Sequence, residues 1–248
     1  MKIVVNHLTR MREGRICVAG VEPESGRHVR PVTKWGQIDG RLLAGRSLDG
    51  REGPFNMGHV VDLGRVEPDA QKLHVEDHSF VPWKARFIER LHAEDFWALL
   101  YRMSHPRLKR IFGDELRMMG RQTCGVDVGA GDASLGVLRL VNRPRIYLRR
   151  EKNSALPSVR MRIDDEQMRV DVSVTDLRLF GSDHMSVNET MVERVDRRLQ
   201  DSGPVLLGLG LGRAFAARSE KGGARHWLQV NNIHFEENPI WGFVERKG

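Results

Sequence analysis

The sequence has few of the features that would place a protein outside the cell or in a membrane. It contains two cysteines in 248 residues, Cys17 and Cys124, and their spacing matches no metal or redox motif. No apolar run approaches the length that spans a bilayer, and Met1 leads directly into a strand-like segment rather than a signal peptide. These observations exclude a disulfide-stapled secreted scaffold and indicate a soluble cytoplasmic protein with free thiols.

Recognisable catalytic and cofactor motifs are also missing. No Ser/His/Asp or Cys/His arrangement can be read from the sequence. Residues 45–51 have the outer glycine spacing of a phosphate loop but lack its Lys and Ser/Thr, and no helix follows the glycines at 208–212. We therefore expect a protein that is not an enzyme and that uses no cofactor. The weakest alternative is a metal-dependent nuclease whose ligands are His74, Asp77 and His78.

Lysine is scarce, whereas arginine is abundant. Lys and Arg together number 40, of which eight are lysine and 32 arginine, and the formal net charge is +7. A positive balance favours an acidic partner, and the planar guanidinium binds phosphate through paired hydrogen bonds and stacks on bases. A GC-rich genome that encodes Arg in place of Lys explains the same composition, so the charge alone does not decide between these readings.

Alternating apolar residues predict a β-rich first half. Strands are expected at 2–8, 15–21 and 27–32, separated by tight turns, and again at 59–66 and 72–75. Apolar residues then recur every three to five positions, which predicts a helical segment over 84–112. We assign residues 1–131 to a first unit.

The second unit, residues 132–248, has clearer signals. We predict a long strand over 135–149, bent near Pro144, and a hairpin formed by 159–163 and 168–177. A helix follows over 187–200, with the Ser186–Glu189 spacing of a capping box. The chain ends with a hairpin of strands 205–211 and 227–233. Glycines at alternate positions of its first strand allow tight coiling or close approach of another segment.

Three strands, a helix and two strands is the element order of an OB-fold, a five-stranded barrel. The predicted fold class is therefore mainly β with a few helices, arranged as two tandem OB-like five-stranded barrels. The segments KIVVNHLTRMREGRICVAGVE and VLLGLGLGRAF…HWLQVNNIHFEENPIW resemble the prokaryotic dual-OB-containing (DuOB) domain proteins over almost the whole chain. The resemblance implies nucleic-acid binding in RNA-repair or genome-conflict settings, and it supplies no catalytic residues.

One strand is the best candidate for contact with nucleic acid. Side chains alternate along a strand, so Arg143, Arg145, Tyr147 and Arg149 should project from one face. Guanidinium groups on both sides of a phenol ring can follow a phosphate backbone while the ring stacks on a base. The alternative is an ordinary solvated face. The sequence has only two tyrosines, which makes this position notable.

Two further groups of basic residues extend this candidate surface. The loop between the last two strands carries an aromatic residue among basic ones, and the first unit has basic residues around its early strands. Solvent-exposed surface charge explains both groups equally well. The residues are Arg213, Phe215, Arg218, Lys221 and Arg225 in the loop, and Arg10, Arg12, Arg30 and Lys34 in the first unit.

The predicted function is non-catalytic binding of single-stranded or structured RNA or DNA in an arginine-rich groove with aromatic stacking, in bacterial repair or phage defence. Little base specificity is expected, because phosphate contacts carry no sequence code. The alternative is a protein-interaction module that docks onto a partner enzyme of such a system. Arginines gathered on one continuous surface would favour nucleic acid, and scattered arginines beside an exposed apolar patch would favour a protein partner.

Overall fold

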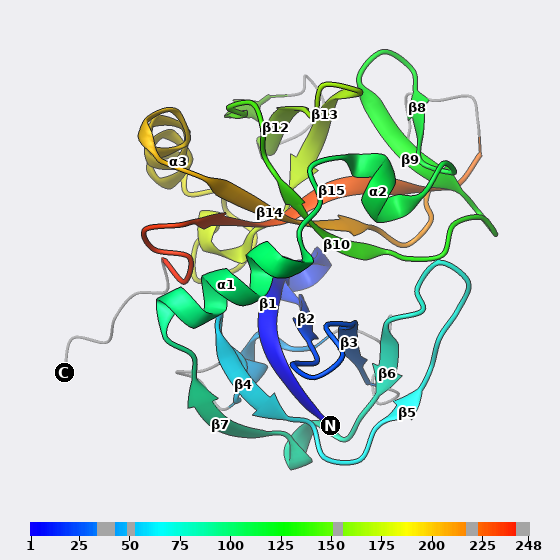
Figure 1. Cartoon of the computed structure of the whole chain (residues 1–248), viewed down its shortest axis with the longest axis vertical. Helices are drawn as coiled ribbons and strands as arrows, with labels where there is room; N and C mark the ends of the chain where they lie inside the picture. Colours follow the sequence, from blue (N-terminus) through cyan, green and yellow to red (C-terminus); the bar gives the residue numbers. More distant parts are fainter. Residues whose placement is uncertain (34–42, 49–52, 151–155, 217–222, 242–248) are drawn as a thin grey trace.

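The computed structural model describes residues 1–33, 43–48, 53–150, 156–216 and 223–241 (Figure 1). Two curled sheets lie one above the other in this view: the first, in blue and cyan, is formed by the N-terminal strands, and the second, in green to orange, by the C-terminal strands. Within these ranges no helix is both long and apolar enough to cross a bilayer.

The first barrel has OB-type connectivity. Its strands follow the order β6-β3-β2-β1-β4, with antiparallel pairing except between β3 and β6, which are parallel. Numbered along the chain, this is the order 5-3-2-1-4 of a partly open OB barrel. Short strands extend both ends of the sheet. The elements are β1 (Lys2–Arg10), η1 (Arg12–Gly14), β2 (Ile16–Val21), β3 (His28–Val32), η2 (Gly45–Ser47), β4 (His59–Asp62), β5 (Glu67–Pro68), β6 (Asp77–Ser79), η3 (Pro82–Lys84) and β7 (Arg86–Arg90).

The predicted helix over 84–112 is wrong in its first part. Residues 86–90 form β7, an edge strand that pairs with β4 and is exposed at every position. Helices α1 (Ala93–Met103) and α2 (Leu108–Phe112) follow. Helix α1 buries apolar residues in the core of the first barrel, whereas α2 packs against the core of the second. The apolar spacing that predicted a helical segment over 84–112 therefore covers a strand and two helices.

The second barrel closes through one interrupted strand. Its order is β10-β14-β15-β13-β12-β11, so β10 (Leu135–Arg139) and β11 (Arg145–Arg149), which are consecutive in sequence, lie at opposite ends of the path. Together they are the first OB strand, bent over 140–144 as the sequence predicted, which gives the cyclic order 1-2-3-5-4-1. The other strands are β12 (Ser158–Asp164), β13 (Arg169–Val174), β14 (Val205–Leu211) and β15 (Arg225–Phe235), with β13 and β15 parallel. The predicted fold class is confirmed.

Helix α3 (Glu189–Asp201) connects the third and fourth strands after the short η4 (Leu177–Leu179), close to the predicted range 187–200. Its N-cap is Asn188, whose side chain accepts from the Met191 amide at 3.0 Å. Ser186 instead donates its hydroxyl to Asp183 at 2.5 Å in the preceding turn. The predicted capping box is therefore replaced by an asparagine cap with the same purpose, because both satisfy an unpaired amide of the first turn.

A hairpin of β8 (Arg117–Met119) and β9 (Thr123–Asp127) hydrogen-bonds to the beginning of β15. These residues are therefore joined to the second sheet, although they precede residue 131. The division of the chain at that residue stays a prediction.

The two barrels meet where β1 crosses β14 and β15, and small residues make the approach possible. A Cβ atom added at Gly208 of β14 would lie 2.9 Å from Cε1 of His7. Strands β1 and β15 each carry a bulge, which leaves Asn6 in β1 and Asn231 in β15 as extra residues. We call this contact region the seam. Its polar side chains come from segments more than 200 residues apart.

Candidate functional site

The outer surface of β11, β12 and β13 gathers arginines from neighbouring strands. Register places Arg145 opposite Arg162 and Tyr147 opposite Arg160, all with side chains on the side away from the core. Residues at the alternate positions of β11 and β12 belong to the apolar core. We call this surface the strand face, and it consists of Arg145, Tyr147, Arg149, Arg160, Arg162 and Asp171. The predicted residue Arg143 is exposed and precedes β11, outside the strand register.

Arg160 and Arg162 were missed by the sequence analysis. The segment SVRMRID alternates apolar and basic residues in the same manner as the predicted strand at 145–149, which was the available signal. What the sequence did not reveal is the register that sets these arginines directly beside Arg145 and Tyr147. The predicted residues of β11 are therefore brought together, and two arginines of β12 join them.

Asp171 of β13 orders the centre of the strand face. Its Oδ2 accepts a hydrogen bond from the Tyr147 hydroxyl, and its Oδ1 accepts one from Arg160 Nε at 3.0 Å. Arg162 Nε lies 3.7 Å from the same Oδ2. Burial raises the pKa of Tyr147, and the hydrogen bond to Asp171 adds to the effect. The phenol therefore stays protonated and keeps its ring in place. The Arg162 guanidinium carbon lies 5.0 Å from the ring centroid, a cation–π contact.

Helix α3 borders the strand face with acidic residues. Asp196 receives a forked ion pair from Arg145, with Nε–Oδ1 at 3.1 Å and Nη2–Oδ2 at 2.8 Å. Glu189 pairs with Arg150 at 2.7 Å. The side chains of Arg145 and Arg162 nevertheless remain 64% exposed. They can therefore meet a ligand without unfolding of the surrounding sheet.

The loop between β14 and β15 holds another part of the predicted site. The Phe215 ring is about half exposed and lies 6.3 Å from the ring of Trp227, whose Nε1 donates to the Phe215 carbonyl at 3.0 Å. Arg225 pairs with Asp127 at 2.9 Å. Arg213 pairs with Asp77 of the first barrel. The remaining predicted loop residues, Arg218 and Lys221, lie outside the described residues.

Of the predicted residues of the first barrel, Arg30 does not lie on an exposed surface. Arg30 is buried and paired with Glu76 at 3.4 Å and Asp77 at 3.0 Å. Arg10 lies over the Phe180 ring at 5.0 Å, and burial lowers its pKa. Arg12 is exposed on the turn after β1, and Lys34 lies outside the described residues. Arg30 is therefore part of the seam rather than of the solvent-exposed surface.

The residues considered as metal ligands are engaged with the protein itself. The Asp77 carboxylate is fully buried and paired with two arginines, and His78 Nδ1 lies 2.9 Å from the Glu76 carbonyl oxygen. Over the described parts of the chain, no three His, Cys, Asp or Glu side chains are grouped so that they could hold a metal ion.

Fold and site together define a protein of two OB-type barrels whose second barrel carries an arginine-lined sheet surface. Comparison with known families agrees with this class. The chain belongs to the dual OB-containing domain family (DuOB), whose model matches residues 1–233, and the resemblance noted in the sequence is confirmed. A search of curated proteins finds no match to the sequence.

Proposed function

We propose that the protein binds single-stranded or structured RNA or DNA on the strand face of its second barrel and catalyses no reaction. The observation that carries this proposal is the cross-strand alignment of Arg145 with Arg162 and of Tyr147 with Arg160. OB-folds bind oligonucleotides on the surface of their second and third strands, flanked by the loops that follow strands one and four. Strands β12 and β13 are the second and third strands here, and the loop with Arg213 and Phe215 follows the fourth.

The chemistry of the strand face suits a phosphate backbone. Arg145 and Arg162 offer exposed, charged donors, and Asp171 holds the neighbouring Tyr147 and Arg160 in fixed positions. Arginine binds phosphate oxygens in pairs, so a phosphate would replace Asp196 as the partner of Arg145. Such contacts position a strand without reading bases. We therefore expect weak sequence preference and affinity that depends steeply on salt.

Fluorescence anisotropy tests the proposal. Labelled single-stranded RNA, single-stranded DNA and duplex are titrated with the protein at two salt concentrations, with and without Mg²⁺. Salt-sensitive binding that is lost in the double variant Arg145→Glu/Arg149→Glu supports the strand face. Binding that the double variant retains with unchanged salt dependence contradicts it. Intact oligonucleotides after incubation with Mg²⁺ support the non-catalytic part, and cleavage would contradict it.

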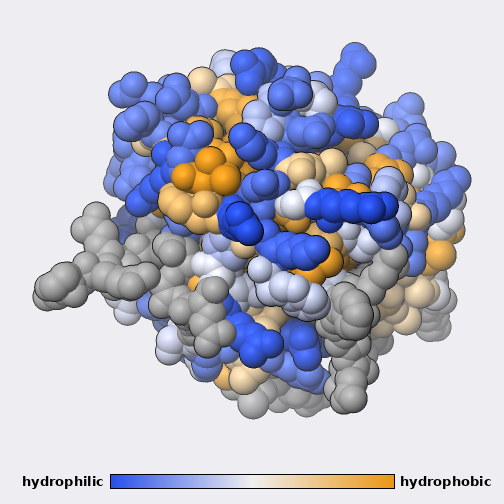
Figure 2. Space-filling model, turned by 90° about the horizontal axis from the view of Figure 1, so that it is seen from below, coloured by the Kyte–Doolittle hydropathy of each residue, from blue (hydrophilic) through white to orange (hydrophobic). Residues whose placement is uncertain are grey.

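A setting in repair or phage defence belongs to the same proposal and rests on the family resemblance alone. A second candidate, a docking module for a partner enzyme, has one structural observation in its favour. The edge strand β7 and the turn before it expose Trp83 and Phe87. Figure 2 shows hydrophobic residues at the surface in several separate areas among hydrophilic ones, on the face seen from below. If none of the nucleic acids binds at low salt, the docking module becomes the preferred function.

A further inference from the structure

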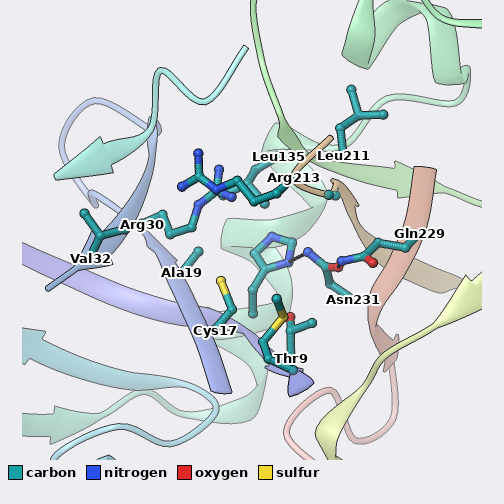
Figure 3. Close-up of a pocket in the computed structure, with 14 residues that line it drawn as sticks. Thr9, Cys17, Ala19, Arg30, Val32, Leu135, Leu211, Arg213, Gln229 and Asn231 are labelled. Carbon is teal, nitrogen blue, oxygen red and sulfur yellow. Dashed lines mark hydrogen bonds between the residues drawn. The ribbon is translucent and has the colours of Figure 1, made fainter. Parts of the chain in front are cut away.

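A small cavity of about 50 Å³ lies in the seam between the barrels (Figure 3). Strands β1, β2 and β3 of the first barrel form one side, and the start of β10, the end of β14 and the middle of β15 form the other. We call it the seam pocket. The polar residues that line it are His7, Thr9, Arg30, Arg213, Gln229 and Asn231.

Three residues that line the seam pocket each carry a buried polar atom without a partner in the described structure. His7 Nε2, the Thr9 hydroxyl and Arg213 Nη1 are each buried and make no hydrogen bond within the described structure. His7 and Thr9 are 1% and 2% exposed. Burying a polar group without a partner is costly, so native proteins rarely leave several together. Three such atoms on residues of one pocket point to a ligand that supplies the missing partners.

The hydrogen-bond network defines which kind of partner is missing. Gln229 Nε2 donates to Asn231 Oδ1 at 2.9 Å, which leaves the Asn231 amide nitrogen 3.3 Å from His7 Nδ1. His7 Nδ1 therefore accepts, and its proton resides on Nε2. Burial lowers the pKa of His7, so the ring is neutral and Nε2 is a donor. The unpartnered atoms of His7 and Arg213 are thus N–H donors, and Thr9 adds a hydroxyl.

The two charged residues that line the pocket are both basic, and the carboxylates that pair with them, Glu76 and Asp77, are not among its lining residues. Arg30 and Arg213 approach each other from different barrels, as Figure 3 shows, and both pair with the buried Asp77. Of the residues that line the pocket, none is acidic. Arg213 is 32% exposed, so the pocket can be reached from solvent at that point. A cavity of this size holds about three to five waters at roughly 10–15 Å³ each, which is room for a small polyatomic ion.

We propose that the seam pocket binds a phosphate-type oxyanion through Arg213, Thr9 and His7. Phosphate oxygens accept several hydrogen bonds and carry the negative charge that arginine favours. The same chemistry is offered by inorganic phosphate, by a nucleoside monophosphate and by the phosphorylated end of a nucleic-acid strand. The proposal is independent of the strand face, because the two sites share no residue.

Binding of inorganic phosphate and AMP, followed by 15N NMR of the histidine side chains at constant ionic strength, tests the proposal. We expect saturable shifts of the His7 Nε2 signal in the wild-type protein. Thr9→Val keeps the side-chain shape but removes one hydrogen bond to a charged ligand, so affinity should fall roughly tenfold. Arg213→Gln should lower affinity further. Arg65→Gln, at an exposed arginine of the first barrel, is the matched control and should bind as wild type.

Oligonucleotides with and without a 5′-phosphate distinguish the sources. Tighter binding of the phosphorylated strand, with a difference that Thr9→Val removes, supports recognition of a nucleic-acid end. Binding of phosphate or AMP without any such difference supports a small-molecule ligand.

No shift of His7 with any of these ligands would show a pocket that holds water only and would overturn the proposal. Unchanged affinity in folded Thr9→Val protein would overturn it as well. The double variant of the strand face should leave the phosphate-induced shifts intact, so that the two sites fail or succeed separately.

Discussion

Asn232 of β15 binds both backbone groups of Leu8 in β1: its Oδ1 accepts from the Leu8 amide at 2.9 Å, and its Nδ2 donates to the Leu8 carbonyl at 3.2 Å. The side chain is fully buried. A primary amide thus takes the place of a neighbouring strand along β1 beyond Val4, the last residue that pairs with β4. The barrels are joined through the backbone of one and a side chain of the other.

Replacement of Asn232 by Ala should therefore destabilise the whole protein. It leaves a buried N–H and a buried C=O unpaired, which costs roughly 2–4 kcal/mol. Urea unfolding followed by circular dichroism measures the change. Asn142→Ala, at an exposed amide that contacts the Asp164 carbonyl at 3.4 Å, is the control and should stay within about 0.5 kcal/mol. Equal stabilities of the two variants would contradict the role of Asn232.

Arg162→Gln should weaken nucleic-acid binding uniformly across sequences. If Arg162 contacts a phosphate, its loss reduces the slope of log affinity against log salt by about 1. Anisotropy titrations at several salt concentrations measure this slope. The matched control is again Arg65→Gln, whose side chain is exposed in the first barrel. A slope unchanged in Arg162→Gln would remove this residue from the interface.

Tyr147 should act through its ring more than through its hydroxyl. Tyr147→Phe loses the hydrogen bond to Asp171 but keeps the ring, so nucleic-acid affinity should remain close to that of the wild type. Tyr147→Ala removes a stacking surface that contributes about 1–3 kcal/mol per base. Anisotropy of the two variants with single-stranded RNA separates these effects. Equal losses in both would mean that the hydrogen-bonded position, and not the ring, matters for binding.

Mild acid should destabilise the fold through buried histidines. Burial, followed by the charge of Arg178, lowers the pKa of His234 to about 4. The folded protein therefore keeps this ring neutral, whereas the unfolded chain takes up a proton below about pH 6.5. The free energy of unfolding should fall as the pH drops from about 6.5 to 4, by roughly 3 kcal/mol for this residue.

Urea unfolding at several pH values between 7 and 4 checks this expectation. His7 contributes in the same direction, because burial also lowers its pKa. His234→Gln should flatten the dependence, because a glutamine cannot take up the proton. A variant with the same slope as the wild-type protein would show that His234 is not responsible.

The sequence predicted those helices and strands whose apolar and polar residues recur with a regular local period. The amphipathic helix at 187–200 and the alternation along 145–149 both appear in the structure, because their periods reflect which side faces the core. The predicted helical segment over 84–112 is wrong at 86–90, which form an edge strand. Both faces of this strand are exposed, so apolar and polar residues do not alternate along it and the sequence gives no sign of a strand. The sequence does not show which residues face each other on neighbouring strands, nor how the two barrels pack together. Arg213 and Asp77, 136 positions apart, meet only because two barrels pack together.

The apolar core of the first barrel does not come from the first barrel alone. Val137, Leu177 and Leu206 belong to it, and all three lie in the C-terminal half of the chain. In return, Leu73 of the first half joins the core of the second barrel. A sequence that predicts two tandem barrels thus folds with each barrel completing the apolar core of the other. Separating the two halves of the chain would therefore expose apolar side chains on both.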